Sequence, residues 1–271
     1  MKNKQERKLI GVDCDGTFFD SDAYPSKRTC DVVQRVVDAG HAIVAVTGRS
    51  RLTAAERLIG VAGMRYLVCS NGAYTWDTQE GAVVWETPMH QSLVNDIVSR
   101  LRAVFPDVAF GWETGKGIGF EETFKELAGG GDDLESGGNP GDPWTQGLYK
   151  LFVRRPGVYR LELQRELSAV LGDGLCEIST SGAPFVEITA EQTHKASGLS
   201  KTASMLGFTA DETIVFGDNQ NDLPMFGWAG HAVAMGNALD SVKARAHALT
   251  LPNIEHGVAH YLENLLAAGK L

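Results

Sequence analysis

The chain has 271 residues, 43% of them hydrophobic and 22% charged, and its 25 Lys and Arg against 34 Asp and Glu give a net charge of −9. This size and composition exclude a disulfide-stapled miniprotein, a disordered chain and a coiled coil. The acidic balance argues against nucleic acid or an anionic membrane surface as a partner.

The chain lacks the sequence signals of a membrane or secreted protein. No apolar stretch approaches the roughly 20 residues of a membrane span, and the run Leu9–Val12 is too short for a secretory signal. The cysteines are scattered, with no spacing typical of a zinc site, at Cys14, Cys30, Cys69 and Cys176. We therefore expect free thiols and a cytoplasmic protein.

The first third of the chain alternates short apolar runs with amphipathic segments. Apolar, β-branched runs predict buried strands at Leu9–Val12, Ala42–Val46 and Tyr66–Cys69. Helical spacing of apolar residues predicts helices over Thr29–Ala39 and Leu52–Ile59. Because strands and helices alternate with short connections, we expect a parallel sheet with helices packed on it.

The middle of the chain, 84–186, predicts a different α+β domain. Its strand-like runs are Val83–Trp85, Val108–Trp112, Leu148–Val153 and Leu175–Ile178. Helical spacing covers Leu93–Val104 and Tyr159–Leu171. Between them the Gly- and Asp-rich tract Gly129–Pro143 predicts a surface loop.

The last third returns to the alternating pattern. Its expected elements are a helix over Lys195–Leu206, strands at Ile214–Phe216 and Ala232–Met235, and a helix over Ile254–Leu266. We therefore expect an α/β protein whose Rossmann-like, doubly wound parallel-sheet core comprises residues 1–83 and 187–271. The domain over 84–186 is inserted into this core.

Two carboxylates, Asp13 and Asp15, directly follow the first expected strand. Ligands of open parallel sheets bind beyond the carboxyl ends of the strands, so both side chains can point into one site. An ordinary Asp-Gly turn is the alternative. A calcium-binding EF-hand loop is excluded, because it needs Gly at its sixth position and Glu at its twelfth, whereas Gly16 is fourth and Tyr24 is twelfth.

Two further segments could bind a phosphate. The second strand ends in Thr47-Gly48-Arg49, where a hydroxyl and adjacent backbone N–H groups suit a phosphate oxygen, although a helix cap is an alternative. Lys195 near the start of a helix could supply a cation to the same phosphate. A solvated surface lysine is the alternative for Lys195.

A second polar segment follows the strand Ile214–Phe216 and contains two carboxylates, Asp218 and Asp222, and the amide Asn221. These residue types also form polar turns. Acidic side chains at two strand ends of one sheet would repel each other unless a cation offset their charge. Hard oxygen ligands suit Mg²⁺, so the sequence predicts a magnesium site.

These four ordered motifs resemble those of the haloacid dehalogenase-like phosphohydrolases. Three further segments, Ser70–Ala73, Glu187–Thr189 and Ala234–Ala238, are similar to the Cof-type sugar-phosphate phosphatases. That branch carries a type IIB α/β cap, inserted after the third core strand, that selects the substrate. The resemblance implies a Mg²⁺-dependent phosphatase, a monomer or homodimer, that acts on a small phosphorylated metabolite such as a sugar phosphate.

The resemblance also implies roles for individual residues. Asp13 would be the nucleophile that forms an aspartyl-phosphate, and Asp15 would protonate the leaving oxygen and then activate water. Mg²⁺ would be held by Asp13, the Asp15 backbone carbonyl and Asp218. The transferring phosphoryl group would be surrounded by Thr47, Gly48, Lys195 and Asn221. Asp222 would orient Lys195 or a metal-bound water.

Other functions stay open at this point. The presence of both Asp13 and Asp15 favours phosphate esters over a dehalogenase, which needs no acid for an alcohol leaving group. A phosphosugar mutase of the same superfamily would share all four motifs. A non-catalytic, phospho-ligand-binding regulatory module would be expected to lose one of the motif residues. In the inserted domain, Trp112 and Trp144 could line a substrate pocket or pack in the core.

Overall fold

The computed structural model describes residues 6–127 and 148–271, which divide into two compact units. The first unit comprises Met1–Trp85 and Lys195–Leu271, and the second unit comprises Glu86–His194. The first unit is therefore built from two segments that are far apart in the chain. The predicted loop Gly129–Pro143 and Trp144 lie outside the described residues.

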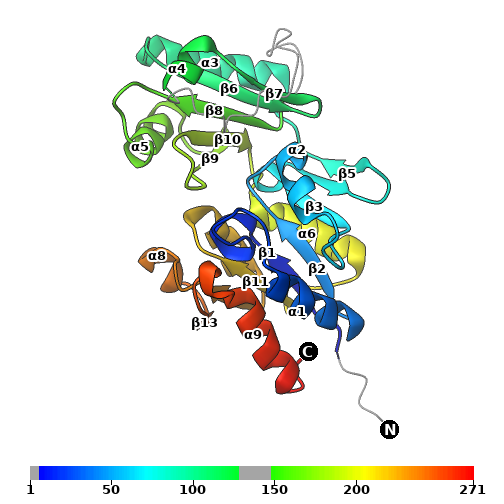
Figure 1. Ribbon diagram of the computed structural model, residues 1–271. Coiled ribbons are helices and arrows are strands. Elements are labelled where there is room, and N and C mark those ends of the chain that lie inside the picture. Colours follow the sequence, from blue (N-terminus) through cyan, green and yellow to red (C-terminus); the bar gives the residue numbers. More distant parts are fainter. Residues whose placement is uncertain (1–5, 128–147) are drawn as a thin grey trace. The chain divides into compact units, whose positions relative to one another are not determined.

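An eight-stranded sheet forms the centre of the first unit, in the order β13-β12-β11-β1-β2-β3-β4-β5 (Figure 1). Its strands are β1 (Leu9–Val12), β2 (Ala42–Val46), β3 (Tyr66–Cys69), β4 (Tyr74–Asp77), β5 (Ala82–Glu86), β11 (Thr213–Gly217), β12 (His231–Ala234) and β13 (Ala248–Leu249). Pairing is parallel from β13 to β3 and antiparallel between β3 and β4. The central strand β1 pairs with β2 through Leu9 and Ala42, and with β11 through Leu9 and Thr213.

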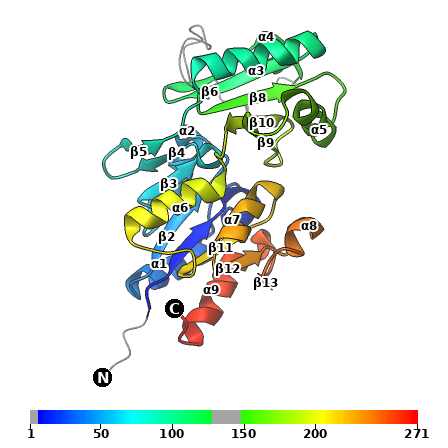
Figure 2. The same ribbon diagram turned by 180° about the vertical axis from the view of Figure 1, so that it is seen from behind.

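Helices cover both faces of this sheet. Helices α1 (Lys27–Asp38) and α9 (Gly257–Ala267) pack together on one face (Figure 1), and α6 (Lys195–Leu206) and α7 (Leu223–Trp228) pack together on the other (Figure 2). Two shorter helices are α2 (Arg51–Ala54) and α8 (Asp240–Lys243). The expected α/β fold with a doubly wound core sheet is confirmed.

The second unit is an α+β sandwich around a five-stranded sheet in the order β7-β6-β8-β10-β9. Its elements are α3 (Gln91–Val104), β6 (Ala109–Thr114), β7 (Gly117–Phe120), α4 (Glu122–Leu127), β8 (Lys150–Arg154), α5 (Arg160–Leu171), β9 (Cys176–Ser179) and β10 (Val186–Ala190). Strand alternation sends Trp112, Leu151 and Ile188 into the core that α3 and α5 share. Trp112 is thus a core residue of this unit.

The opposite face of the second sheet carries two kinds of buried group. Phe120 and Phe152 form a small aromatic cluster with Phe124 of α4. Beside it, Lys150 Nζ lies 2.7 Å from Glu187 Oε1, and both side chains are at most 3% exposed. Removing either partner would leave a buried charge without its counter-ion, so this pair constrains the sheet.

Three expectations differ from the structure. The domain boundary lies at Lys195 and not at 187, because β10 pairs with β8 and β9 in the second sheet. Strand β5, expected in the inserted domain, belongs to the first sheet. The helix expected over Leu52–Ile59 is split into α2 and a 3₁₀ turn, and it ends where Gly60 adopts a φ of +80°.

Candidate active site

Three carboxylates meet at the carboxyl ends of β1 and β11. Asp13 follows β1, Asp218 follows β11, and Asp222 ends the 3₁₀ turn Gln220–Asp222. The strands are parallel neighbours, with Val12 opposite Phe216, so both chain ends leave the sheet at the same edge. Each of the three residues offers a carboxylate oxygen, and these oxygens all lie within 4.8 Å of one another.

Lys195, the first residue of α6, joins two of these carboxylates. Its Nζ donates to Asp13 Oδ1 and to Asp222 Oδ1, each at 2.6 Å, and its side chain is 1% exposed. Burial alone would lower the pKa of Lys195, but the Asp13 and Asp222 carboxylates outweigh burial and raise it above its usual range. Lys195 is therefore a permanent buried cation and not a surface lysine.

Asp222 also closes the loop that carries Asp218. Its Oδ2 accepts the backbone N–H groups of Asp218 and Asn219, each at 2.9 Å. The strand end has no room for a side chain, because a Cβ on Gly217 would lie 2.5 Å from Asp222 Cγ. A single buried carboxylate thus bonds both the loop backbone and Lys195.

The loop that follows β1 approaches Asp218 closely at Gly16. Its φ is +77°, and a Cβ there would lie 2.5 Å from Asp218 Oδ2. The neighbouring Thr17 donates its hydroxyl to Asp218 Oδ1 at 3.2 Å. Asn237 donates its side-chain N–H to the Gly16 carbonyl at 2.8 Å, which ties the segment Ala234–Ala238 to this loop.

Two of the three clustered acids, Asp13 and Asp218, have raised pKa values. Burial raises the pKa of Asp13 well above its ordinary value; the Lys195 charge opposes this rise, whereas Asp222 and Asp218 add to it. Burial and the Asp222 charge raise the pKa of Asp218 to about 6. The carboxylates of Asp13, Asp218 and Asp222 repel one another, and their oxygens are suitable ligands for a hard divalent cation such as Mg²⁺, which would offset their charge.

Asp15, which the sequence analysis grouped with Asp13, pairs with Arg49 and not with the three clustered carboxylates. Arg49 holds its carboxylate with two bonds, Nε to Oδ2 and Nη2 to Oδ1, each at 2.7 Å. Thr47 is fully buried, and its Oγ1 accepts the Arg49 backbone N–H at 3.0 Å across Gly48. Arg49 stands in the second motif, but nothing in the sequence indicates its bidentate pairing with Asp15.

Asn221 lies in the same loop as Asp222 and is 8% exposed. Its Nδ2 donates to Asn71 Oδ1 at 3.1 Å. Sequence reasoning gave Asn71 no role, although it belongs to the segment Ser70–Ala73 that carried the family resemblance. Arg49 and Asn71 therefore contact the predicted site residues Asp15 and Asn221, although the sequence analysis assigned neither of them to the site.

A match to a protein-family model decides which family this site belongs to. The model for haloacid dehalogenase-like hydrolases matches residues 10–262, which include every motif described above. The chain belongs to the haloacid dehalogenase-like hydrolase family.

Relatives of known class agree with this assignment. The 5-amino-6-(5-phospho-D-ribitylamino)uracil phosphatase YitU of Bacillus subtilis (strain 168) is 30% identical over 274 residues, which cover 94% of this chain and 96% of that protein. The pyridoxal phosphate phosphatase YbhA of Escherichia coli (strain K12) is 24% identical over 275 residues, which cover 94% and 97%. The expectation of a phosphatase of this family is confirmed.

The fold has close counterparts among solved structures. The subclass IIB sugar phosphatase BT4131 superposes with a TM-score of 0.80 at 22% identity, over 97% of this chain and 100% of that one. Within residues 6–127 and 148–271, no helix has both the length and the apolar character needed to cross a bilayer.

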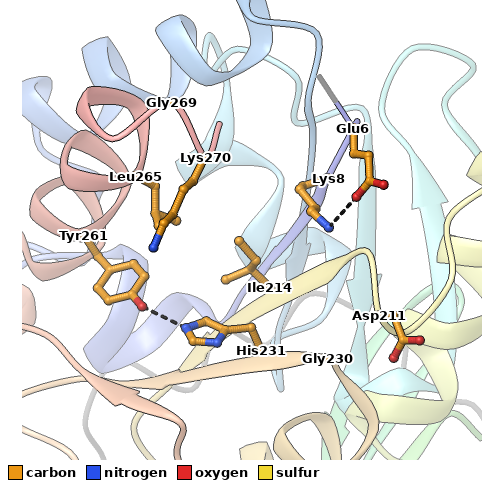
Figure 3. Close-up of a pocket in the computed structure, with 10 residues that line it drawn as sticks. All are labelled: Glu6, Lys8, Asp211, Ile214, Gly230, His231, Tyr261, Leu265, Gly269 and Lys270. Atoms are coloured by element: carbon orange, nitrogen blue, oxygen red, sulfur yellow. Dashed lines mark hydrogen bonds and ion pairs between the residues drawn. The ribbon is translucent and has the colours of Figure 1, made fainter. Parts of the chain in front are cut away.

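A cavity of about 840 Å³ in the phosphatase lies away from the carboxylate cluster. Its walls include Lys8 before β1, Ile214 early in β11 and His231 at the start of β12, which are the amino ends of the strands (Figure 3). His231 Nε2 is 2.8 Å from Tyr261 Oη. Burial and the nearby His247 and Lys270 lower the pKa of His231. The cavity therefore belongs to the opposite edge of the sheet from the phosphatase motifs.

Asp218→Asn should stabilise the metal-free phosphatase. The folded pKa of Asp218, about 6, exceeds the ordinary value, so its destabilising effect is absent below about pH 4, grows between about pH 4 and pH 6, and is constant above that. At pH 7 in EDTA, urea denaturation should give the variant a free energy of unfolding higher by up to about 3 kcal/mol. At pH 4 the two proteins should be equally stable, and Mg²⁺ should stabilise the wild type more than the variant. A variant less stable than wild type at pH 7 in EDTA would contradict this electrostatic account.

Proposed function

We propose that this phosphatase is a Mg²⁺-dependent phosphohydrolase that cleaves small phosphate monoesters, sugar phosphates among them, through an aspartyl-phosphate on Asp13. The observation that carries the proposal is the buried contact of 2.6 Å between Lys195 Nζ and Asp13 Oδ1, next to the carboxylates of Asp218 and Asp222. This contact orients Asp13 and provides the positive charge that an approaching phosphate needs.

Asp13 would attack the phosphorus atom with its carboxylate oxygen, and the ester oxygen would leave with the proton of Asp15. Water, deprotonated by Asp15, would then attack the phosphorus of the aspartyl-phosphate, which releases inorganic phosphate and restores the Asp13 carboxylate. Thr47, the Gly48 amide, Lys195 and Asn221 would hold the phosphoryl oxygens.

Mg²⁺ would be held by Asp13, Asp218 and the Asp15 carbonyl oxygen, and when bound it would supply charge that lets two anions approach each other. Asp222, with one oxygen on Lys195 and the other on two backbone N–H groups, would keep Lys195 and Asp218 in place. The acid role of Asp15 requires a rearrangement. Arg49 occupies both carboxylate oxygens of Asp15, so Arg49 must release Asp15 before this carboxyl group can reach the leaving oxygen.

The relatives support a phosphorylated metabolite as the substrate class. YitU is named for a phosphoribitylamino-uracil, YbhA for pyridoxal phosphate, and BT4131 for sugar phosphates. All three are phosphate monoesters of small polar molecules. We also propose that the second unit has the role of an inserted cap, which is to select among such esters.

The test is phosphate release from a panel of hexose and pentose phosphates, pyridoxal phosphate, nucleotides and p-nitrophenyl phosphate. Release should require Mg²⁺, stop in EDTA and return when Mg²⁺ is restored. The order of kcat/KM values across the panel should rank sugar phosphates above p-nitrophenyl phosphate. Release that continues in EDTA would refute the metal requirement. Isomerisation of a hexose phosphate without phosphate release would show a mutase in place of a phosphatase.

A further inference from the structure

A turn of unusual backbone conformation follows β3. Ser70, Asn71 and Gly72 have φ angles of 51°, 55° and 93°, so three consecutive residues lie in the left-handed region. That region disfavours residues with a side chain, yet Ser70 and Asn71 occupy it while almost fully buried, at 0% and 2% exposed. Strain of this kind persists only where the surrounding structure holds it in place.

The turn is bonded to the loop that carries Thr47. The Ser70 backbone N–H donates to the Arg49 carbonyl at 2.9 Å, and the Asn71 N–H donates to the Thr47 carbonyl at 3.0 Å. The left-handed backbone is what directs two successive N–H groups toward one neighbouring loop. The turn therefore holds the Thr47–Arg49 loop in position through two backbone hydrogen bonds.

The turn also packs against the start of α6. A Cβ on Gly198 would lie 2.7 Å from Gly72 Cα, so the helix backbone contacts the turn with no side chain between them. Gly198 is one helical turn after Lys195. The turn Ser70–Gly72 thus also limits how α6, and with it Lys195, can be placed.

The side chain of Asn71 makes the third connection. Its Oδ1 accepts from Asn221 Nδ2 at 3.1 Å, and both side chains are buried. This bond decides which way the Asn221 amide faces. With Nδ2 directed to Asn71, the buried Asn221 Oδ1 finds no hydrogen-bond partner within the part of the chain that the structure describes. Nδ2 carries two N–H groups, so while one bonds Asn71 the other can donate to a phosphoryl oxygen, which the acceptor Oδ1 could not hold.

We propose that Asn71 is a positioning residue of the phosphatase, which acts through Asn221 and not on the substrate itself. Its left-handed backbone fixes the Thr47 loop, and its amide oxygen fixes the orientation of Asn221. Glycine suits this backbone better than asparagine does, so the side chain is explained by its bond to Asn221 and not by the turn. The inference rests on the proposed function, in which Asn221 holds a phosphoryl oxygen.

Asn71→Gly separates the two roles, because it keeps the left-handed turn and removes the bond to Asn221. We expect kcat/KM for the best substrate of the panel to fall by about 10- to 100-fold. The unfolding midpoint should stay close to that of wild type, because the relief of the left-handed backbone offsets the loss of one buried hydrogen bond. Ala23→Gly is the matched control, since Ala23 also has a left-handed φ, 59°, and the change removes no polar side chain. Its kcat/KM should match wild type.

A double-mutant cycle then tests the route of action. If Asn71 acts through Asn221, Asn71→Gly with Asn221→Ala should lose no more activity than Asn221→Ala alone. Losses that multiply would overturn the inference, and so would wild-type kcat/KM in Asn71→Gly. A clearly lowered unfolding midpoint in Asn71→Gly would also overturn it, because Asn71 would then be a structural residue. Asp13→Asn, assayed in parallel, reports on the proposed function separately, since turnover in that variant would refute the nucleophile whatever the result at Asn71.

Discussion

Asp13→Asn should lower the rate of phosphate release by at least about 10⁴-fold, because an amide cannot form the acyl-phosphate on which turnover depends. The replacement is isosteric, and its amide oxygen can still accept the bond from Lys195. It also removes one of several mutually repelling buried charges, so the variant should fold and be no less stable than wild type in EDTA. Activity loss with a normal unfolding curve would separate chemistry from folding.

Two measurements check this result. Steady-state phosphate release compares the variant with wild type at saturating Mg²⁺. Acid quenching of the wild type during turnover, followed by peptide mass analysis, should find a phosphoryl group on the peptide that contains Asp13. The nucleophile assignment fails if the variant keeps more than about a hundredth of wild-type turnover, or if the phosphoryl group is found on another peptide.

Lys195→Met should have the second-largest effect, and it should damage both activity and stability. Activity should fall by about 10²- to 10³-fold, since one preorganised donor to the transferring group is lost. In EDTA at pH 7 the free energy of unfolding should fall by about 3–5 kcal/mol, because Asp13 and Asp222 lose the cation that lies 2.6 Å from each. Methionine fills the volume of the lysine stem, so the charge is the main change.

The pH dependence of this variant follows from the sign of the carboxylate shifts. Loss of Lys195 removes the interaction that lowers the pKa of Asp13 and Asp218, so both values should rise further above those of the unfolded chain. A raised folded pKa means that stability is regained as pH falls. Urea denaturation at pH 5 and pH 7 should therefore show a smaller deficit at pH 5. Lys27→Met, which removes an exposed lysine paired with Asp31, is the control and should change stability by less than about 0.5 kcal/mol at either pH. Equal stability of Lys195→Met and wild type at pH 7 in EDTA would contradict the buried-cation role.

Sequence patterns predicted the parts of the fold that depend on local periodicity. The apolar runs at Leu9–Val12, Ala42–Val46 and Tyr66–Cys69 are strands with those bounds, because fully buried strands of a parallel sheet are continuous apolar segments. The membership of Val186–Ala190 in the second sheet was not predictable in this way. A buried strand that pairs with β8 and β9 has the same local pattern as one that pairs with core strands.

In the site, too, the features that depend on one strand end were predictable, and the contacts between distant segments were not. Strand ends indicated Asp13 and Asp218 as neighbours, because parallel strands deliver their carboxyl ends to one edge. The pairing of Asp15 with Arg49 and of Asn71 with Asn221 depends on side-chain directions across 34 and 150 residues of chain, which no spacing rule encodes. The motif Ser70–Ala73 was visible, but its left-handed backbone was not, since serine seldom adopts it and asparagine adopts it only in a minority of cases.

The pairing of β1 with both β2 and β11 has a consequence for biosynthesis. A growing chain that has not yet reached Lys195 already contains Asp13, Asp15 and Thr47, but it lacks the strand on the other side of β1 and every group that β11 and α6 deliver. The second unit is one continuous segment and can fold on the ribosome, whereas the central strand must wait for a partner more than 200 residues further along, as the Leu9–Thr213 pair shows. The catalytic centre therefore cannot assemble until Asp218 and Asp222 have been synthesised, so a chain that stops before β11 lacks the site.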